Sequence, residues 1–302
     1  MKKVIVALLL MLPLLAFAQE KKYVVVSVSA ANLRAEPDYE SPLETQALMG
    51  SVMEVLDSSN YWLKVHLLEP SYTAWVNRLQ VHPCASSVSS DYIVKAKYST
   101  LYEEPSERSA VICDLVRGDL LQKPVRDSEK GGSCASRSRK GFVAVTIPST
   151  SRMGWVRKRD LCDPSTLDGN GQSIVDEALS YLGTPYLWGG TTVKGFDCSG
   201  LVRQCYLMAG IKLPRNASEQ LHEGEELSVE GVLEGRWDHL RPGDLLFFGN
   251  RQTGRVSHVA IYAGNGHIVH SSMVVRYNSL LEGSEDYYEN AWRLLYARRM
   301  LH

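Results

Sequence analysis

The sequence has no excess of charge of either sign, since its 302 residues carry 33 lysine and arginine side chains against 34 aspartate and glutamate side chains. Binding to nucleic acid or to an anionic membrane surface needs a basic excess, so neither partner is expected. Beyond residue 18 there is no apolar run long enough to span a bilayer, which argues against stable membrane insertion. The chain also lacks C-x-x-C and H-x-x-x-H pairs, so we expect no metal site and no cofactor.

The first 18 residues have the composition of a secretory signal rather than of a folded domain. Lys2 and Lys3 precede an apolar run at residues 4–15, and the small-x-small segment at residues 16–18 is typical of a cleavage site. The sequence therefore predicts a signal peptide at residues 1–18 and export of the remaining chain to the periplasm or the extracellular space. We expect the exported protein to be a monomer.

The six cysteines of an exported protein can form disulfides. Cys198 and Cys205 belong to the segment that carries the chemistry described below, which leaves four others. These four could form two bridges, whose pairing cannot be deduced from sequence. They are Cys84, Cys113, Cys134 and Cys162.

The first half of the chain contains a diverged internal repeat. The segment N-L-R-A-E-P at residues 32–37 resembles T-L-Y-E-E-P at residues 100–105, and a later A-W-V segment resembles a later G-W-V segment. Short runs of branched and apolar residues between turn residues predict β-strands in both copies. The pattern resembles bacterial SH3-like domains, which implies two small β-barrels at residues 22–82 and 90–162.

A linker rich in Asp, Pro, Gly and Asn leads into a third domain at residues 171–302. There, Cys198 follows a glycine-rich loop and precedes an apolar segment at residues 201–209, which Gly210 ends. The thiol is therefore expected at a helix N-terminus, where the partial positive charge lowers the thiol pKa. Backbone N–H groups at the same place can stabilise an oxyanion, so the sequence predicts a nucleophile that attacks a carbonyl carbon.

A cysteine nucleophile needs a base, and His258 is the candidate. It lies in residues 256–262, where apolar and polar side chains alternate as they do in a strand. The Asn-Gly dipeptide in the turn at residues 264–266 predicts a hairpin, and the second strand of this hairpin carries His270. The two imidazoles can then lie side by side, with His270 orienting His258.

Six motifs follow one another in the third domain. They are Y-L-G-T-P-Y-x-W-G-G (181–190), F-D-C-S-G-L-V (196–202), L-P-R (213–215), R-P-G-D-L-L-F-F (241–248), S-H-V-A-I-Y (257–262) and I-V-H-S (268–271). Their length and order resemble the NlpC/P60 family of papain-like peptidases. With two SH3-like domains in front, the whole chain resembles γ-D-glutamyl-L-diamino acid endopeptidases. The implied fold class is α+β, a papain-like NlpC/P60 catalytic domain preceded by two small SH3-like β-barrels.

The resemblance implies a role for each matching residue of the nucleophile and its partners. Cys198 would attack the γ-amide carbonyl that links D-Glu to a diamino acid, His258 would relay the proton, and His270 would orient His258. Asp197 would hold the free amino group of an N-terminal L-Ala, and Ser199 would line the same pocket. The chain would thus be a cysteine peptidase, a hydrolase acting on murein peptides.

The resemblance also implies how the cleft is bounded. Tyr186 would place its hydroxyl near the oxyanion, and Trp188 would form a wall of the site. In relatives an acidic residue and a tyrosine of the first SH3-like domain close one end of the cleft, for which Glu44 and Tyr72 are the candidates and Glu36 is an alternative. A closed end with a carboxylate favours a cationic free N-terminus and excludes glycan-attached chains, so the predicted substrate is a released stem peptide.

One position departs from the family pattern. Asn216 stands in L-P-R-N-A-S where relatives often carry aspartate, which would soften the binding of a cationic substrate group. Arg215 and Ser218 flank it and are implied only as neighbours of the pocket.

Three alternatives remain open from the sequence. The enzyme could cut intact cross-linked peptidoglycan, with the SH3-like domains as wall anchors. The chain could instead be a non-catalytic scaffold that binds the wall, or the Cys/His pair could transfer acyl groups to an amine. Retention of the cysteine, of both histidines and of the helix-start position favours an enzyme. The preferred diamino acid is not indicated.

Overall fold

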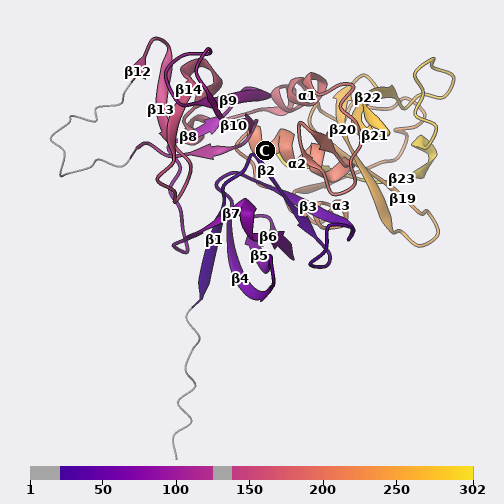
Figure 1. Cartoon of the computed structure of the whole chain (residues 1–302). Coiled ribbons are helices and arrows are strands. Elements are labelled where there is room, and N and C mark those ends of the chain that lie inside the picture. The colour runs from indigo at the N-terminus through magenta and orange to yellow at the C-terminus, as the bar shows by residue number, and fades with distance from the viewer. Residues whose placement is uncertain (1–20, 125–137, 302) are drawn as a thin grey trace, which may run out of the picture.

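The computed structural model describes residues 21–124 and 138–301 (Figure 1). The predicted signal peptide at residues 1–18 and Cys134 lie outside the described residues. Two β-structured units come first along the chain, and a third unit contains all the α-helices of the described ranges. Within those ranges, no helix is long and apolar enough to cross a membrane.

The first unit is one antiparallel sheet of seven strands in the order β3-β2-β6-β5-β4-β1-β7. Its strands are β1 (Lys22–Val26), β2 (Ala30–Arg34), β3 (Leu43–Leu48), β4 (Val52–Ser59), β5 (Trp62–Leu68), β6 (Ser71–Asn77) and β7 (Val81–Cys84), with a 3₁₀ turn at Arg78–Gln80 before β7. Alternate residues of the strands point inward, and Leu33, Val65 and Val76 are fully buried in a shared apolar core.

The second unit consists of a five-stranded and a three-stranded sheet, ordered β10-β9-β14-β13-β12 and β11-β8-β15. Its strands are β8 (Tyr92–Val94), β9 (Tyr98–Tyr102), β10 (Val111–Val116), β11 (Leu120–Leu121), β12 (Ser138–Arg139), β13 (Phe142–Thr146), β14 (Met153–Arg157) and β15 (Leu161–Cys162), and 3₁₀ turns occupy Lys158–Asp160 and Pro164–Thr166. The repeat seen in the sequence has a structural counterpart, because the segments N-L-R and T-L-Y lie in β2 and β9 and each copy's Trp-Val pair lies in β6 or β14.

The third unit packs helices against one face of a six-stranded antiparallel sheet in the order β18-β23-β19-β20-β21-β22. Its elements are α1 (Gly171–Ser180), β16 (Thr191–Thr192), β17 (Gly195–Phe196), α2 (Cys198–Met208), α3 (Ala217–Gln220), β18 (Glu225–Leu227), β19 (Leu245–Gly249), β20 (Val256–Gly264), β21 (His267–Ser272), β22 (Val274–Ser279) and β23 (Leu294–Arg299), with a 3₁₀ turn at Ala291–Arg293. The expected hairpin joins β20 and β21 through Asn265 and Gly266, which both have positive φ angles (49° and 72°).

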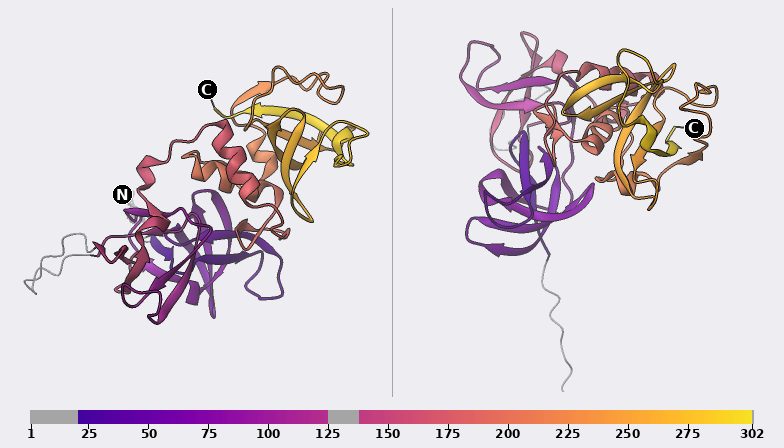
Figure 2. Two further views of the ribbon diagram at one scale, coloured as in Figure 1. Left: turned by 90° about the horizontal axis from the view of Figure 1, so that it is seen from above. Right: turned by 90° about the vertical axis from the view of Figure 1, so that its right-hand side faces the viewer.

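Both β-units pack directly against the third unit. In Figure 2 the helices lie between the β-units and the six-stranded sheet. Leu48 of the first unit and Val116 of the second are buried in the same apolar cluster as the helices. The Lys194 ammonium, in the β16–β17 hairpin, donates to Ser29 Oγ of the first unit (2.9 Å) and pairs with Asp114 of the second (2.7 Å). The three units therefore meet at one hairpin, close in sequence to the nucleophile.

The prediction of two disulfides is wrong. Cys84, Cys113 and Cys162 are free thiols in the structure, whereas two bridges among four cysteines would need at least one bond between two of these three. The reason is their placement, since they lie on β7, β10 and β15, which belong to three different sheets. The predicted fold class, by contrast, is confirmed: an α+β domain follows SH3-like β-structure.

Candidate active site

The predicted nucleophile is the first residue of α2. Asp197 occupies the N-cap position with extended backbone angles, and its side chain accepts the N–H of Gly200 at 2.7 Å. Cys198 is partly buried, and the backbone N–H groups of Ser199 and Val259 both reach its sulfur. Two N–H groups that converge on the sulfur stabilise negative charge on it, and so favour the nucleophilic thiolate.

The expectation of a lowered thiol pKa is wrong for this resting site. Burial, together with the negative charge of Asp197, raises the Cys198 pKa to about 11, although the two N–H groups act in the opposite direction. Desolvation penalises the charged form of any group, and here it outweighs the helix N-terminus. Cys198 therefore rests as a thiol rather than as a thiolate.

The structure brings His258 and His270 together on neighbouring strands of the hairpin. His258 Nε2 lies 2.8 Å from His270 Nδ1, and the rings meet edge to face. Burial lowers the pKa of His258 to about 3 and that of His270 to about 4, and the positive charge of His270 adds to the effect on His258. The ring of Tyr288 packs against both imidazoles, and the ring of Phe248 packs against that of His258.

A neutral imidazole beside a neutral thiol can act by general-base catalysis. Val259, whose N–H reaches the Cys198 sulfur, directly follows His258 on β20, so the strand that carries the base also touches the nucleophile. His258 can accept the thiol proton as the sulfur attacks a carbonyl carbon and can return it to the leaving amine.

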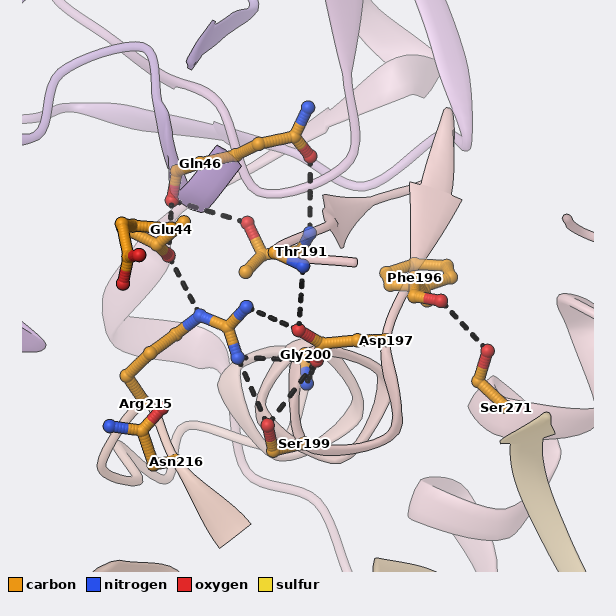
Figure 3. Close-up of polar contacts among 12 residues, drawn as sticks. Glu44, Gln46, Thr191, Phe196, Asp197, Ser199, Gly200, Arg215, Asn216 and Ser271 are labelled. Atoms are coloured by element: carbon orange, nitrogen blue, oxygen red, sulfur yellow. Dashed lines mark hydrogen bonds and ion pairs between the residues drawn. The ribbon is translucent and has the colours of Figure 1, made fainter. Parts of the chain in front are cut away.

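A second cluster at the start of α2 is a buried ion pair (Figure 3). Arg215 is 2% exposed, and its Nη1 and Nη2 atoms donate to the two Asp197 carboxylate oxygens at 3.1 and 2.5 Å. The Gly189 N–H also donates to Asp197 Oδ2 at 3.0 Å, which ties the glycine-rich loop to the helix start. Arg215 Nε donates to Thr45 Oγ1 on β3 at 2.7 Å. One guanidinium thus joins the first β-unit to the N-cap of the nucleophile helix.

Two glycines of the family motifs are required by close backbone approaches at this junction. Gly189 has φ of +77°, and a Cβ there would lie 2.8 Å from the carbonyl oxygen of Leu43 on β3. A Cβ on Gly200 would lie 2.1 Å from the carbonyl oxygen of Gly190. Gly189 therefore allows β3 of the first β-unit to approach, and Gly200 allows the loop before the nucleophile to pack against α2.

The Asp197 carboxylate is already saturated. Besides the Arg215 and backbone contacts it accepts the Ser199 hydroxyl at 3.2 Å, and Asp197 is only 7% exposed. Ser199 in turn accepts a hydrogen bond from Arg215 Nη1 at 3.0 Å. The structure therefore uses both residues to build the helix start, and it leaves Asp197 little capacity for a substrate ammonium group.

Glu44 and Tyr72 lie together at the same junction. The Tyr72 hydroxyl donates to Glu44 Oε2 at 2.6 Å, and Glu44 precedes Thr45, the partner of Arg215. Burial, and then the bond to Glu44, raises the Tyr72 pKa to about 12, so the phenol stays protonated as a donor; the charge of Arg215 is also felt at Tyr72. Glu36 lies in the exposed loop after β2, where its N–H is bonded to Ser41 Oγ.

The remaining predicted residues are partly or largely exposed. Tyr186 is held by a backbone hydrogen bond to the Met273 carbonyl (2.9 Å); burial, followed by the charges of Cys198 and Asp197, raises its pKa to about 12. Trp188 is 68% exposed. Asn216 begins α3, where its N–H donates to Glu219 Oε2 at 3.0 Å.

Sequence reasoning missed the polar residues that hold this site together. On β3, Gln46 Oε1 accepts the Thr191 N–H at 3.1 Å, so the first β-unit is fastened directly beside the catalytic loop. On β22, Asn278 Oδ1 lies 3.1 Å from His270 Nε2. Its position could have been found, because a hairpin of β21 and β22 makes Asn278 a diagonal neighbour of His270.

The raised thiol pKa predicts how Cys198 reacts with iodoacetamide. Since only the thiolate is nucleophilic, the alkylation rate should rise about tenfold per pH unit from pH 5 to pH 8. The Cys198-containing peptide is quantified by mass spectrometry, and Cys198→Ser identifies alkylation of the other thiols. A rate that stays constant across this range would mean a thiolate–imidazolium pair and would contradict the neutral resting state.

The buried ion pair predicts strong coupling between Arg215 and Asp197. Arg215→Met should lower the free energy of unfolding by about 3–5 kcal/mol, because it leaves a buried carboxylate unpaired. Asp197→Asn in the same chain should recover part of that loss, which a double-mutant cycle in urea measures. The control is the exposed Arg236–Glu234 pair, with an expected coupling below about 1 kcal/mol. Equal coupling energies for the two pairs would show that Arg215 has no special role.

Comparisons with known proteins agree with this geometry. The NlpC/P60 family model matches residues 183–295, and the model of the bacterial dipeptidyl-peptidase Sh3 domain matches residues 33–80. A crystal structure of an NlpC/P60 family protein from Bacillus cereus has the same fold, with a TM-score of 0.74 and 24% identity over 93% of this chain and 100% of that one.

Two curated relatives extend over most of the chain. The γ-D-glutamyl-L-lysine dipeptidyl-peptidase of Bacillus cereus is 29% identical over 252 residues, which are 78% of this chain and 68% of that protein. Dipeptidyl-peptidase 6 of Lysinibacillus sphaericus is 30% identical over 275 residues, which are 85% of this chain and 92% of that protein. With a cysteine at a helix start, a histidine pair on the adjacent hairpin and these relatives, the chain belongs to the NlpC/P60 family of cysteine peptidases.

Proposed function

We propose that this protein hydrolyses the bond between γ-D-Glu and the diamino acid in murein stem peptides whose N-terminal L-Ala is free. The observation that carries the proposal is the Glu44–Tyr72 pair of the first β-unit, which lies at the junction with the nucleophile helix. The names of the relatives, a γ-D-glutamyl-L-lysine dipeptidyl-peptidase and a dipeptidyl-peptidase 6, support the same substrate class.

The charges of the side chains at the junction favour Glu44 as the partner of the substrate's ammonium group. Arg215 neutralises Asp197, and the Asp197 oxygens are filled by hydrogen bonds. Among the residues that the structure describes, the Glu44 carboxylate accepts a hydrogen bond only from the neutral phenol of Tyr72, and no cation forms an ion pair with it. A positively charged free N-terminus can neutralise Glu44, whereas the uncharged N-terminus of a peptide that is still attached to the glycan cannot. Asp197 would then contribute indirectly, by fixing the loop and the helix.

The reaction follows from the neutral Cys/His pair. As Cys198 Sγ bonds to the γ-carbonyl carbon, His258 takes the thiol proton, and backbone N–H groups at the start of α2 stabilise the oxyanion. Collapse of the intermediate breaks the C–N bond, and His258 gives the proton to the leaving amine of the diamino acid. A water, deprotonated by His258, then attacks the thioester and releases L-Ala-γ-D-Glu and the free thiol.

Hydrolysis of intact peptidoglycan is the second candidate, with the β-units as wall anchors. It requires an open cleft end next to Asp197. The docking of β3 against the catalytic loop, through Gln46 and Thr191, argues against such an opening. A freely tethered anchor would also have no need of the buried contact between Thr45 and Arg215.

The proposal predicts that Glu44 discriminates between free and blocked N-termini. Glu44→Gln should lower kcat/KM for L-Ala-γ-D-Glu-L-Lys by about 10- to 100-fold, mainly through KM, because the ammonium loses its charged partner. The N-acetylated tripeptide should be a poor substrate for the parent enzyme and should be affected little by the change. Product formation is followed by liquid chromatography and mass spectrometry.

The matched control is Glu40→Gln, a change of the same kind in the exposed loop before β3, which should leave both rates unchanged. Equal cleavage of the free and the N-acetylated peptide by the parent enzyme would contradict the proposal. So would a Glu44→Gln enzyme that keeps the full preference for the free amine.

A further inference from the structure

The histidine pair continues into a third buried side chain. Asn278, on β22, is 8% exposed, and its Oδ1 lies 3.1 Å from His270 Nε2. Its Nδ2 donates to the backbone carbonyl oxygen of Asp286 at 2.7 Å. The same carbonyl accepts the N–H of Ser279 at 3.0 Å, so the loop that follows β22 is fixed against the strand.

We propose that Asn278 is a positioning residue that selects the tautomer of both active-site histidines and so leaves His258 Nδ1 as the nitrogen that accepts the Cys198 proton. The inference concerns the catalytic pair itself and does not depend on which peptide is cut.

The directions of these hydrogen bonds are set by the backbone carbonyl of Asp286. A backbone carbonyl can only accept hydrogen bonds, so the amide NH₂ of Asn278 must face Asp286 and its oxygen must face His270. That oxygen is again only an acceptor, so His270 Nε2 must carry a hydrogen. The assignment of the amide therefore follows from the partner at its far side.

A neutral imidazole carries a hydrogen on only one of its two nitrogens, and this fixes the state of the other nitrogens in the pair. His270 is fully buried and, with its pKa lowered by burial, is neutral near pH 7, so a hydrogen on Nε2 leaves Nδ1 bare. Bare Nδ1 accepts from His258 Nε2 across 2.8 Å. His258 is neutral for the same reason, so its Nδ1 is bare and can act as a base.

The charged groups around the pair also favour the neutral rings. The cations of Arg276 on β22 and of Arg293 in the 3₁₀ turn before β23 disfavour protonation of His258, and Arg276 does the same for His270. Glu289 acts in the opposite sense on His270, but it is paired with Arg276 at 3.0 Å. If both tautomers were reversed, His270 Nε2 would be bare and would face the Asn278 oxygen, so two buried acceptors would meet without a hydrogen between them.

The test is a direct reading of the tautomers in the full-length protein. Long-range ¹H–¹⁵N correlation spectra of ¹⁵N-histidine-labelled protein at pH 7 distinguish a protonated Nε2 from a protonated Nδ1. We expect the Nε2–H form for both His258 and His270. An Nδ1–H form at either residue would overturn the proposal, and this measurement needs no substrate and no variant.

Two substitutions test the consequence for catalysis. Asn278→Leu removes the acceptor, so His270 should populate both tautomers, and kcat for L-Ala-γ-D-Glu-L-Lys should fall about 10- to 100-fold with KM unchanged, as for outer partners of other functional histidines. Asn278→Asp keeps an acceptor for His270 Nε2, so it should retain the Nε2–H forms and more activity than the leucine variant.

The control is Ser279→Ala. This change removes a buried hydroxyl of β22 that bonds to Ser284 and Leu281 in the following loop, and the hydroxyl forms no hydrogen bond with the histidines. It should change stability but neither the tautomers nor kcat. Unchanged tautomers and kcat in Asn278→Leu would overturn the proposal, as would equal losses in the leucine and aspartate variants. If the tripeptide is not cleaved at all, the substrate proposal fails while the tautomer measurement still decides this one.

Discussion

The buried pair of Asp197 and Arg215 is the interaction on which the site depends. It caps the nucleophile helix, holds the glycine-rich loop and reaches β3 of the first β-unit through Thr45. Removing two charged groups from water costs free energy, and further hydrogen bonds must offset that cost. Here Asp197 and Ser199 accept hydrogen bonds from Arg215. The β-unit is therefore joined through Thr45 and Gln46 to the segments that position the nucleophile.

Two functional properties follow from that arrangement. Arg215 neutralises Asp197, whereas Glu44 of the β-unit forms no ion pair within residues 21–124 and 138–301. Because desolvation disfavours the charged forms of Cys198 and His258, both rest in their neutral forms. In the proposed function, substrate selection and proton transfer both depend on the same close docking.

The sequence predicted what depends on local patterns. The position of Cys198 followed from a helix start, and the pairing of His258 with His270 followed from strand alternation and an Asn-Gly turn. Contacts between distant segments, such as that of Thr45 with Arg215, leave no local signal. The thiol pKa was mispredicted because a helix N-terminus can be recognised in a sequence, whereas desolvation depends on tertiary packing.

The central claim is that the first β-unit closes the cleft and restricts the enzyme to peptides with a free N-terminus. The most direct measurement compares the rates at which the full-length protein releases products from L-Ala-γ-D-Glu-diamino acid tripeptides and from intact sacculi, at equal concentrations of the scissile bond. We predict rapid cleavage of the tripeptides and almost none of the sacculi. Cleavage of sacculi without cleavage of the tripeptides would contradict the account.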